Sequence, residues 1–141
     1  MIQQLFNSDP FQSERLAMVE NQLRGRGIHD ERLLEAMAEV PRHEFIPEAY
    51  RKAAYQDRPV PIGEEQTISQ PYIVAAMISA LQVTTEHKVL EVGTGTGYQA
   101  AVLSRLAGHV FTVERHATLA DQAQQIFQKL GYSNITVVVG D

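Results

Sequence analysis

A glycine-rich turn between an apolar strand and a helix constrains this fold more than any other feature. Residues 88–92 (KVLEV) form a short apolar run, residues 93–97 (GTGTG) follow, and residues 98–107 have the apolar spacing of a helix. Glycine lets the backbone turn tightly and approach a ligand without a Cβ in the way. The pattern therefore predicts a strand, a ligand-binding loop and a helix, and the competing interpretation is a tight turn without a ligand.

The chain beyond this turn alternates again between strand and helix. Residues 110–113 are a predicted strand, residues 117–130 a helix that ends at Gly131, and residues 135–139 a third strand. Such alternation favours right-handed crossovers and a parallel sheet. The predicted fold class is α/β, a Rossmann-like doubly wound parallel sheet. Three strands and two helices are half of such a fold, so we interpret the sheet as truncated after its third strand.

The residues before the sheet predict a helical segment. Ser13, Asp30 and Ser69 stand where each of three helices would be capped, and the first of these helices would end at Gly25 and Gly27. The second helix would stop at Pro41, and a loop-like, proline-rich stretch separates it from the third. The residues expected to face inward are, in chain order, Leu16, Val19, Leu23, Leu33, Leu34, Met37, Ile73, Met77, Ile78 and Leu81.

Composition excludes several kinds of function. The 141 residues carry a net charge of -5, which gives no attraction to nucleic acid or to an anionic membrane surface. No apolar run is long enough to span a bilayer, so we expect a cytoplasmic protein without membrane contact. The chain has no cysteine, which excludes thiolate catalysis, and its five histidines lack the spacing of metal ligands, so no metal site is expected.

Acidic residues flank the glycine turn. A dinucleotide-binding loop of the form GxGxxG would need glycine at position 98, where this chain has Tyr98. Glu91 precedes the turn, and Glu114 ends the second predicted strand, where a carboxylate can accept hydrogen bonds from ribose hydroxyls or simply face solvent. Two acids suit a cationic ligand better than a pyrophosphate. Asp141, after the third strand, is placed to read an adenine amino group.

Three ordered motifs carry a resemblance to a known family. Residues 91–101 (EVGTGTGYQAA) resemble the first motif of class I S-adenosylmethionine-dependent methyltransferases. Residues 66–72 (QTISQPY) resemble the Thr-Ile-Ser segment of the protein-L-isoaspartate O-methyltransferase family, and residues 40–47 (VPRHEFIP) resemble its upstream signature. The likeness extends over residues 18–141 in the family's order.

The resemblance implies methyl transfer from S-adenosylmethionine to the α-carboxylate of L-isoaspartyl residues in damaged peptides and proteins. It implies that Ser69 is the active-site residue, with Thr67 beside it, whereas the spacing alone would favour a helix cap at Ser69. It also divides the chain into a helical, substrate-side segment (residues 1–87) and the first half of a cofactor-binding domain (residues 88–141). The implied cofactor contacts are Gln70, Glu91, Gly93, Thr94, Gly95, Gly97, Glu114 and Asp141.

The implied chemistry needs no catalytic base, because a carboxylate with a pKa of about 4 is already ionised at neutral pH. Two alternatives stay open: another class I methyltransferase acting on a small molecule or RNA, and a catalytically incomplete fragment. An open sheet edge could also pair two copies into a dimer. One departure from the family is that Glu64 and Glu65 precede the Thr-Ile-Ser segment, where a glycine is common, so we hypothesise that Glu65→Gly strengthens peptide binding.

Overall fold

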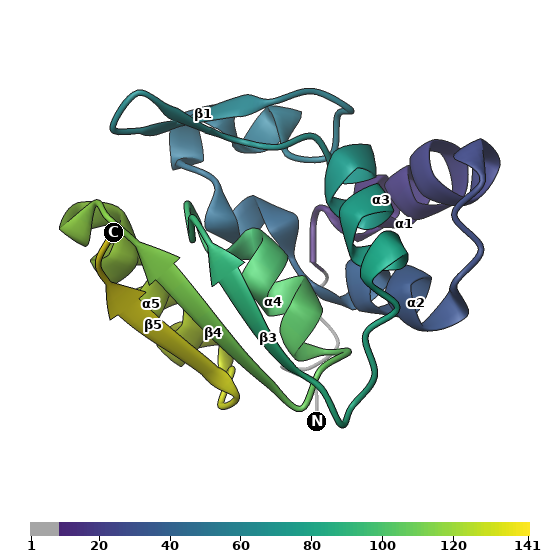
Figure 1. Ribbon diagram of the computed structural model, residues 1–141. Coiled ribbons are helices and arrows are strands. Elements are labelled where there is room, and N and C mark those ends of the chain that lie inside the picture. The colour runs from purple at the N-terminus through teal and green to yellow at the C-terminus, as the bar shows by residue number, and fades with distance from the viewer. Residues whose placement is uncertain (1–8) are drawn as a thin grey trace, which may run out of the picture.

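Three parallel strands form the sheet that the glycine turn predicted (Figure 1). The computed structural model describes residues 9–141. Strand β4 (His109–Glu114) lies between β3 (Lys88–Val92) and β5 (Ile135–Val139), in the order β3-β4-β5. Helix α4 (Tyr98–Ser104) connects β3 to β4, and α5 (Ala117–Leu130) connects β4 to β5. Both crossovers and the parallel pairing confirm the predicted α/β class.

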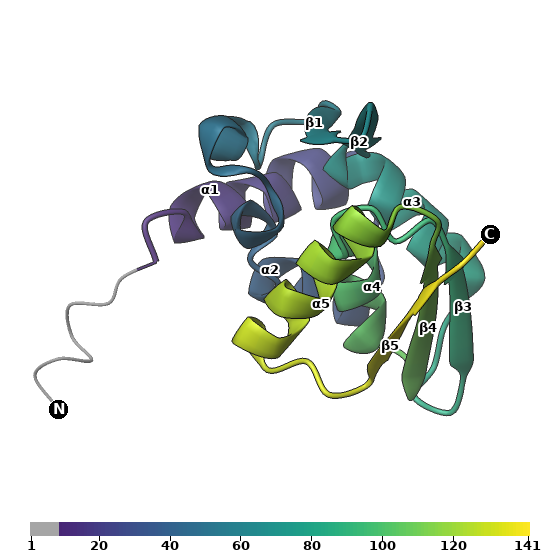
Figure 2. The ribbon, with the colours of Figure 1, turned by 90° about the vertical axis from the view of Figure 1, so that its left-hand side faces the viewer.

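Both connecting helices cover the same face of the sheet (Figure 2). Glu91, Val110 and Thr112 point to this face and are buried. On the opposite face the side chains of Leu90 and Val92 are 66% and 83% exposed, and no described helix covers them there. Among residues 9–141, no helix is long and apolar enough to cross a membrane.

The first helix begins earlier than predicted and changes its pitch. Helix α1 (Gln12–Ala17) starts after Phe11, whose backbone N–H donates to the Asp9 carboxylate at 2.9 Å, so the predicted Ser13 cap is wrong. The chain continues as the π-helix η2 (Met18–Leu23) and the 3-10 turn η3 (Arg24–Arg26). A π-helix turns less per residue than an α-helix and so rotates the inward face. Val19 and Leu23 are buried as expected, whereas Leu16 is 47% exposed.

Helix α2 (Glu31–Glu39) agrees with its prediction. The Asp30 carboxylate accepts the backbone N–H groups of Arg32 and Leu33, at 3.1 and 3.4 Å, and so caps the helix. Val40 then adopts an extended conformation, as the residue before a proline prefers. The inward residues Leu33, Leu34 and Met37 are all buried.

The proline-rich stretch is more ordered than the expected loop. It forms the 3-10 helices η4 (Arg42–Phe45) and η5 (Glu48–Ala53), followed by an antiparallel hairpin of β1 (Val60–Gly63) and β2 (Gln66–Ile68). The hairpin lies above the carboxyl ends of the parallel strands in both ribbon views (Figures 1 and 2). It therefore places β2 over the glycine turn.

Helix α3 (Pro71–Leu81) starts with proline in its first turn, as expected, but its cap and inward face were predicted incorrectly. Gln70 is the N-cap and makes no side-chain capping bond, so Ser69 is not a cap. Of the four predicted inward residues only Ile78 is buried. The helix is apolar on almost every side, so the spacing of apolar residues could not choose its face. The other three are 40–58% exposed: Ile73, Met77 and Leu81.

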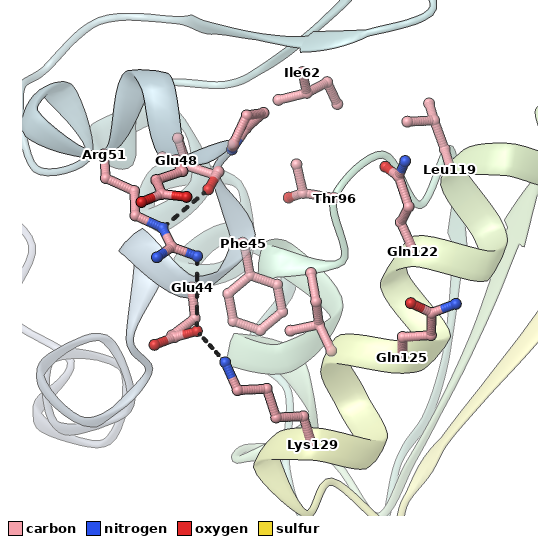
Figure 3. Close-up of a pocket in the computed structure, with 13 residues that line it drawn as sticks. Glu44, Phe45, Glu48, Arg51, Ile62, Thr96, Leu119, Gln122, Gln125 and Lys129 are labelled. Carbon is pink, nitrogen blue, oxygen red and sulfur yellow. Dashed lines mark hydrogen bonds and ion pairs between the residues drawn. The ribbon is translucent and has the colours of Figure 1, made fainter.

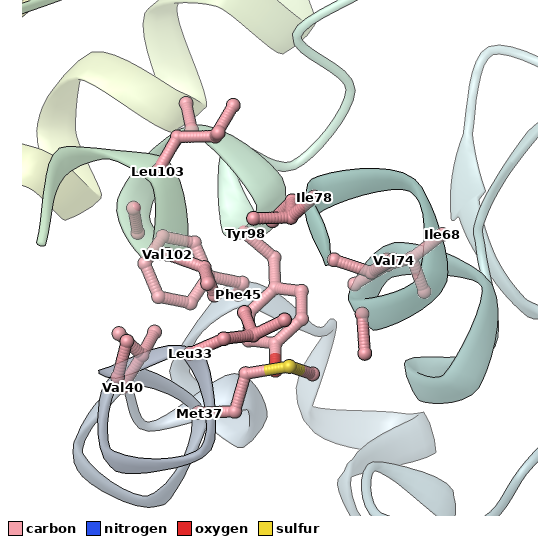
Figure 4. Close-up of a cluster of buried hydrophobic side chains, with 14 of the residues drawn as sticks. Leu33, Met37, Val40, Phe45, Ile68, Val74, Ile78, Tyr98, Val102 and Leu103 are labelled. Atoms are coloured by element: carbon pink, nitrogen blue, oxygen red, sulfur yellow. The ribbon is translucent and has the colours of Figure 1, made fainter. Parts of the chain in front are cut away.

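One buried cluster joins the two halves of the chain (Figure 4). Leu33 and Met37 from α2 and Phe45 from η4 meet Tyr98 and Val102 from α4. The predicted boundary between residues 87 and 88 therefore separates two segments that share a core. The proposed division of their roles stays a prediction, and residues 1–8 lie outside the described chain.

Candidate functional site

The backbone of the glycine turn has a conformation that glycine adopts easily and other residues do not. Gly93, Gly95 and Gly97 all have positive φ, at 92°, 57° and 94°. At Gly97 an added Cβ would lie 2.5 Å from Cζ of Phe127, well inside van der Waals contact. The sequence therefore needs glycine here for both conformation and packing, and the turn presents its backbone at the end of β3.

The Glu114 carboxylate holds this turn from the neighbouring strand. One oxygen accepts the backbone N–H of Gly95 at 2.9 Å, and the other accepts the backbone N–H of His116 at 2.9 Å. Glu114 is buried, which agrees with a constrained group and argues against a solvated strand end. An ionised carboxylate offers about four acceptor positions, so capacity remains for ligand hydroxyls.

Glu91 lies beneath the turn in a buried chain of hydroxyl groups. Its carboxylate accepts the hydroxyl of Thr112 at 2.6 Å, and the Thr112 and Thr94 hydroxyl oxygens are 2.6 Å apart. Burial raises the pKa of Glu91 to about 7, although the Thr112 hydroxyl and Gln99 stabilise the charged form. A cation bound beside Glu91 would favour its charged form.

A small cavity of about 90 Å³ brings the two sequence motifs together. Thr67 and Ser69 line it from the end of the hairpin, and both are exposed. The remaining predicted residues in its lining are Glu91, Gly93, Thr94 and Gly95.

Other predicted site residues lie outside that lining. Gln70 begins α3, Gly97 packs against α5, Glu114 braces the turn, and Asp141 follows β5 at the same end of the sheet. Gln99 also lines the cavity, and the sequence analysis missed it as a site residue although it belongs to the motif of residues 91–101. Among the described residues, no group of three acidic or histidine side chains could hold a metal ion.

A larger cavity of about 460 Å³, which no sequence motif predicted, lies beside the first (Figure 3). Phe45 and Ile126 form apolar parts of its wall, and Glu44 and Lys129 form an ion pair at its edge, 2.9 Å between the Glu44 carboxylate and Nζ. Thr96 of the glycine turn lines both cavities. Space is therefore available next to the predicted site for a ligand larger than the small cavity alone could take.

Comparison with known proteins identifies the family. Residues 13–141 match the family model for protein-L-isoaspartate (D-aspartate) O-methyltransferase. The chain belongs to this family. A relative with that name from Syntrophobacter fumaroxidans is 58% identical over 131 residues, which cover 93% of this chain and 61% of that protein. The relative from Syntrophus aciditrophicus is 53% identical over 133 residues, or 94% and 61% of the two chains.

Solved structures show the same fold. A protein-L-isoaspartate O-methyltransferase superimposes with a TM-score of 0.78 and 30% identity over 92% of this chain and 42% of that chain. A Plasmodium falciparum protein of the same description, with 24% identity and a TM-score of 0.76, shares the fold over 89% and 62%. The chain spans about three-fifths of the length of the curated relatives it matches.

Membership of this family confirms the resemblance that the three motifs indicated. Glu64 and Glu65, the predicted departure from the family pattern, both turn the hairpin with positive φ, at 50° and 55°. The Glu64 carboxylate lies 3.7 Å from Nδ1 of His116, beyond the end of β4. The hairpin tip therefore contacts His116, whose backbone N–H donates to the Glu114 carboxylate.

Proposed function

We propose that this chain binds S-adenosylmethionine and takes part in methyl transfer to the α-carboxylate of L-isoaspartyl residues in damaged proteins. One observation carries the proposal: Thr67 and Ser69 line the same cavity as the glycine turn and Glu91, in a chain of this family. The substrate segment and the cofactor loop lie far apart in sequence, and the hairpin brings them together.

The cofactor side is suited to a cation. The Glu91 carboxylate would attract the ammonium end of the cofactor, the backbone of Gly93 and Gly95 allows close approach, and Glu114 would accept the ribose hydroxyls. We keep Thr94, Gly97, Gln70 and Asp141 as proposed contacts. When bound, S-adenosylmethionine supplies a methyl group that is activated by the positive charge on its sulfur.

The substrate side needs only to hold and orient an anion. The Ser69 and Thr67 side chains are exposed at the cavity, so their hydroxyls can donate hydrogen bonds to a carboxylate that is already ionised. Hydrogen bonds to a charged group contribute about 1.5–3 kcal/mol each. Correct orientation of two reacting groups can lower a barrier by roughly 7–11 kcal/mol, so alignment with the methyl group is a sufficient role for these residues.

A methyl-transfer assay tests the proposal. The chain receives methyl-labelled S-adenosylmethionine with an isoaspartyl peptide or with its aspartyl twin, and labelled ester is counted. We expect label only in the isoaspartyl peptide, and a roughly tenfold or larger loss of rate in Ser69→Ala. Ser133→Ala is the matched control, because Ser133 is also exposed but precedes β5 at the opposite end of the sheet. Equal labelling of both peptides would contradict the proposed specificity.

The remaining expectations about partners stay predictions. These are the absence of nucleic acid and membrane partners, a cytoplasmic location and a dimer that forms through an exposed sheet edge. The position of β3 at one edge of the described sheet supports the dimer, since open edge strands pair readily. Sedimentation at high concentration tests it, and a clean monomer would argue against pairing.

A further inference from the structure

Arg42 is a charged side chain with no exposed surface. It is the first residue of η4, and 0% of it is accessible to solvent. Its hydrogen bonds go to backbone carbonyls: Nε donates to the Ala54 oxygen at 2.6 Å, and Nη2 donates to the Ser69 oxygen at 2.9 Å. Burying a cation is strongly unfavourable unless its surroundings compensate. A side chain kept at that cost is expected to do more than fill space.

The Arg42 guanidinium touches both parts of the proposed site. Through the Ser69 carbonyl it holds the segment that lines the small cavity. Its central carbon also lies 4.8 Å from the centre of the Tyr98 ring, and Tyr98 is the first residue of α4, directly after the glycine turn. One buried cation therefore connects the substrate segment to the start of the cofactor helix.

The Ser69 segment depends on such an external contact. Pro71 restricts the backbone of Gln70 alone, and helix α3 has no side-chain cap that would tie Ser69 to its first turn. Arg42 supplies that tie through the hydrogen bond from Nη2 to the Ser69 oxygen, and the same guanidinium packs on the Tyr98 ring at the start of α4.

We propose that Arg42 is a positioning residue for the substrate carboxylate: it fixes the Ser69 backbone against the first turn of α4 so that the Ser69 hydroxyl faces the cavity. This role rests on the proposed methyl transfer. Its positive charge also lies behind the segment that would receive an anion, and opposite charges attract more strongly in a poorly solvated interior.

The test compares Arg42→Met and Arg42→Lys with Arg32→Met in the complete 141-residue chain. Arg32 is a matched control because it also donates to two backbone carbonyls, those of Val83 at 3.1 Å and Leu106 at 3.0 Å, which follow the far ends of α3 and α4. The dissociation constant of an isoaspartyl peptide is measured with S-adenosylhomocysteine present at saturation.

We expect Arg42→Met to weaken peptide binding by about tenfold or more, since a charge-assisted hydrogen bond is lost, and Arg42→Lys to restore part of it. S-adenosylhomocysteine binding should change much less than peptide binding. Arg32→Met should leave both affinities unchanged. Equal weakening in Arg42→Met and Arg32→Met, or none in either, would overturn the positioning role.

A second readout separates this role from the proposed function. Backbone amide order parameters of Ser69 and Gln70 are measured by NMR without any ligand, after circular dichroism has verified folding. Arg42→Met should lower both order parameters, whereas Arg32→Met should not. If Arg42→Met does not fold, Arg42→Lys takes its place in the comparison. A wild-type chain that bound no isoaspartyl peptide would refute the function alone, and unchanged order parameters would refute the positioning role alone.

Discussion

Replacing Glu91 by glutamine should stabilise the ligand-free protein and weaken cofactor binding at the same time. Glu91 is buried, and burial raises its pKa from 4.5 to about 7. Such a shift corresponds to about 3 kcal/mol of destabilisation when the group is ionised. Glutamine has the same shape and can still accept the Thr112 hydroxyl, but it carries no charge to be buried.

The size of the effect depends on pH. Below the unfolded pKa of 4.5 Glu91 is protonated in both states, and above about 7 it is ionised in both, so the full penalty exists only at the higher pH. We therefore expect Glu91→Gln to raise the free energy of unfolding by about 3 kcal/mol at pH 8 and by less than about 1 kcal/mol at pH 5.

Urea denaturation at the two pH values measures this difference, and calorimetric titration with S-adenosylhomocysteine measures binding. Glu86→Gln is the control, because Glu86 is exposed just before β3. Binding to Glu91→Gln should be at least about tenfold weaker at pH 8, because a charged hydrogen bond is lost. An unfolding free energy at pH 8 that is unchanged or lower would refute the reasoning about Glu91.

Three further substitutions test the fold and the hairpin. Gly97→Ala should lower the free energy of unfolding by about 3 kcal/mol, because the added methyl group overpacks against Phe127 and the φ of Gly97 is positive. A loss below about 1 kcal/mol in urea denaturation would show that α4 and α5 can move apart to accept the methyl group. Asp30→Ala should lower the free energy of unfolding by about 1 kcal/mol, because α2 loses its cap. An unchanged melting temperature would contradict this expectation. Glu65→Gly should stabilise the hairpin by up to about 1 kcal/mol, because the φ of Glu65 is 55° and glycine adopts such an angle more easily. The same substitution should strengthen the binding of an isoaspartyl peptide, and an equal or weaker affinity in a titration would refute that expectation.

The sheet could be predicted because its signals are local and strong. A strand, a glycine turn and a helix permit few arrangements, and Gly131 marks the end of α5 in both sequence and structure. The N-terminal helices were harder. The π-helix of η2 leaves no recognisable pattern, and an all-round apolar helix such as α3 does not reveal which residues face inward. The buried sides are chosen by packing between distant segments, which periodicity does not contain.

The sequence predicts a set of candidate site residues but not their environment. Ser69 and Glu91 come from the motifs and Glu114 from the end of the second predicted strand, yet only the fold shows that Glu114 braces the turn and that Glu91 lies in a buried hydroxyl chain. Arg42 had no signal of its own beyond belonging to a matching motif. Its contact with the Ser69 carbonyl joins residues 27 positions apart.

We propose above that the glycine turn and the hairpin end form one ligand site. Amide chemical-shift mapping by NMR can locate both ligands, with S-adenosylhomocysteine added first and an isoaspartyl peptide second. We predict that the first ligand shifts Gly93 and Gly95, and that the peptide then shifts Thr67 and Ser69 while its aspartyl twin does not. Peptide shifts confined to the larger cavity around Phe45, or identical shifts with both peptides, would contradict the claim.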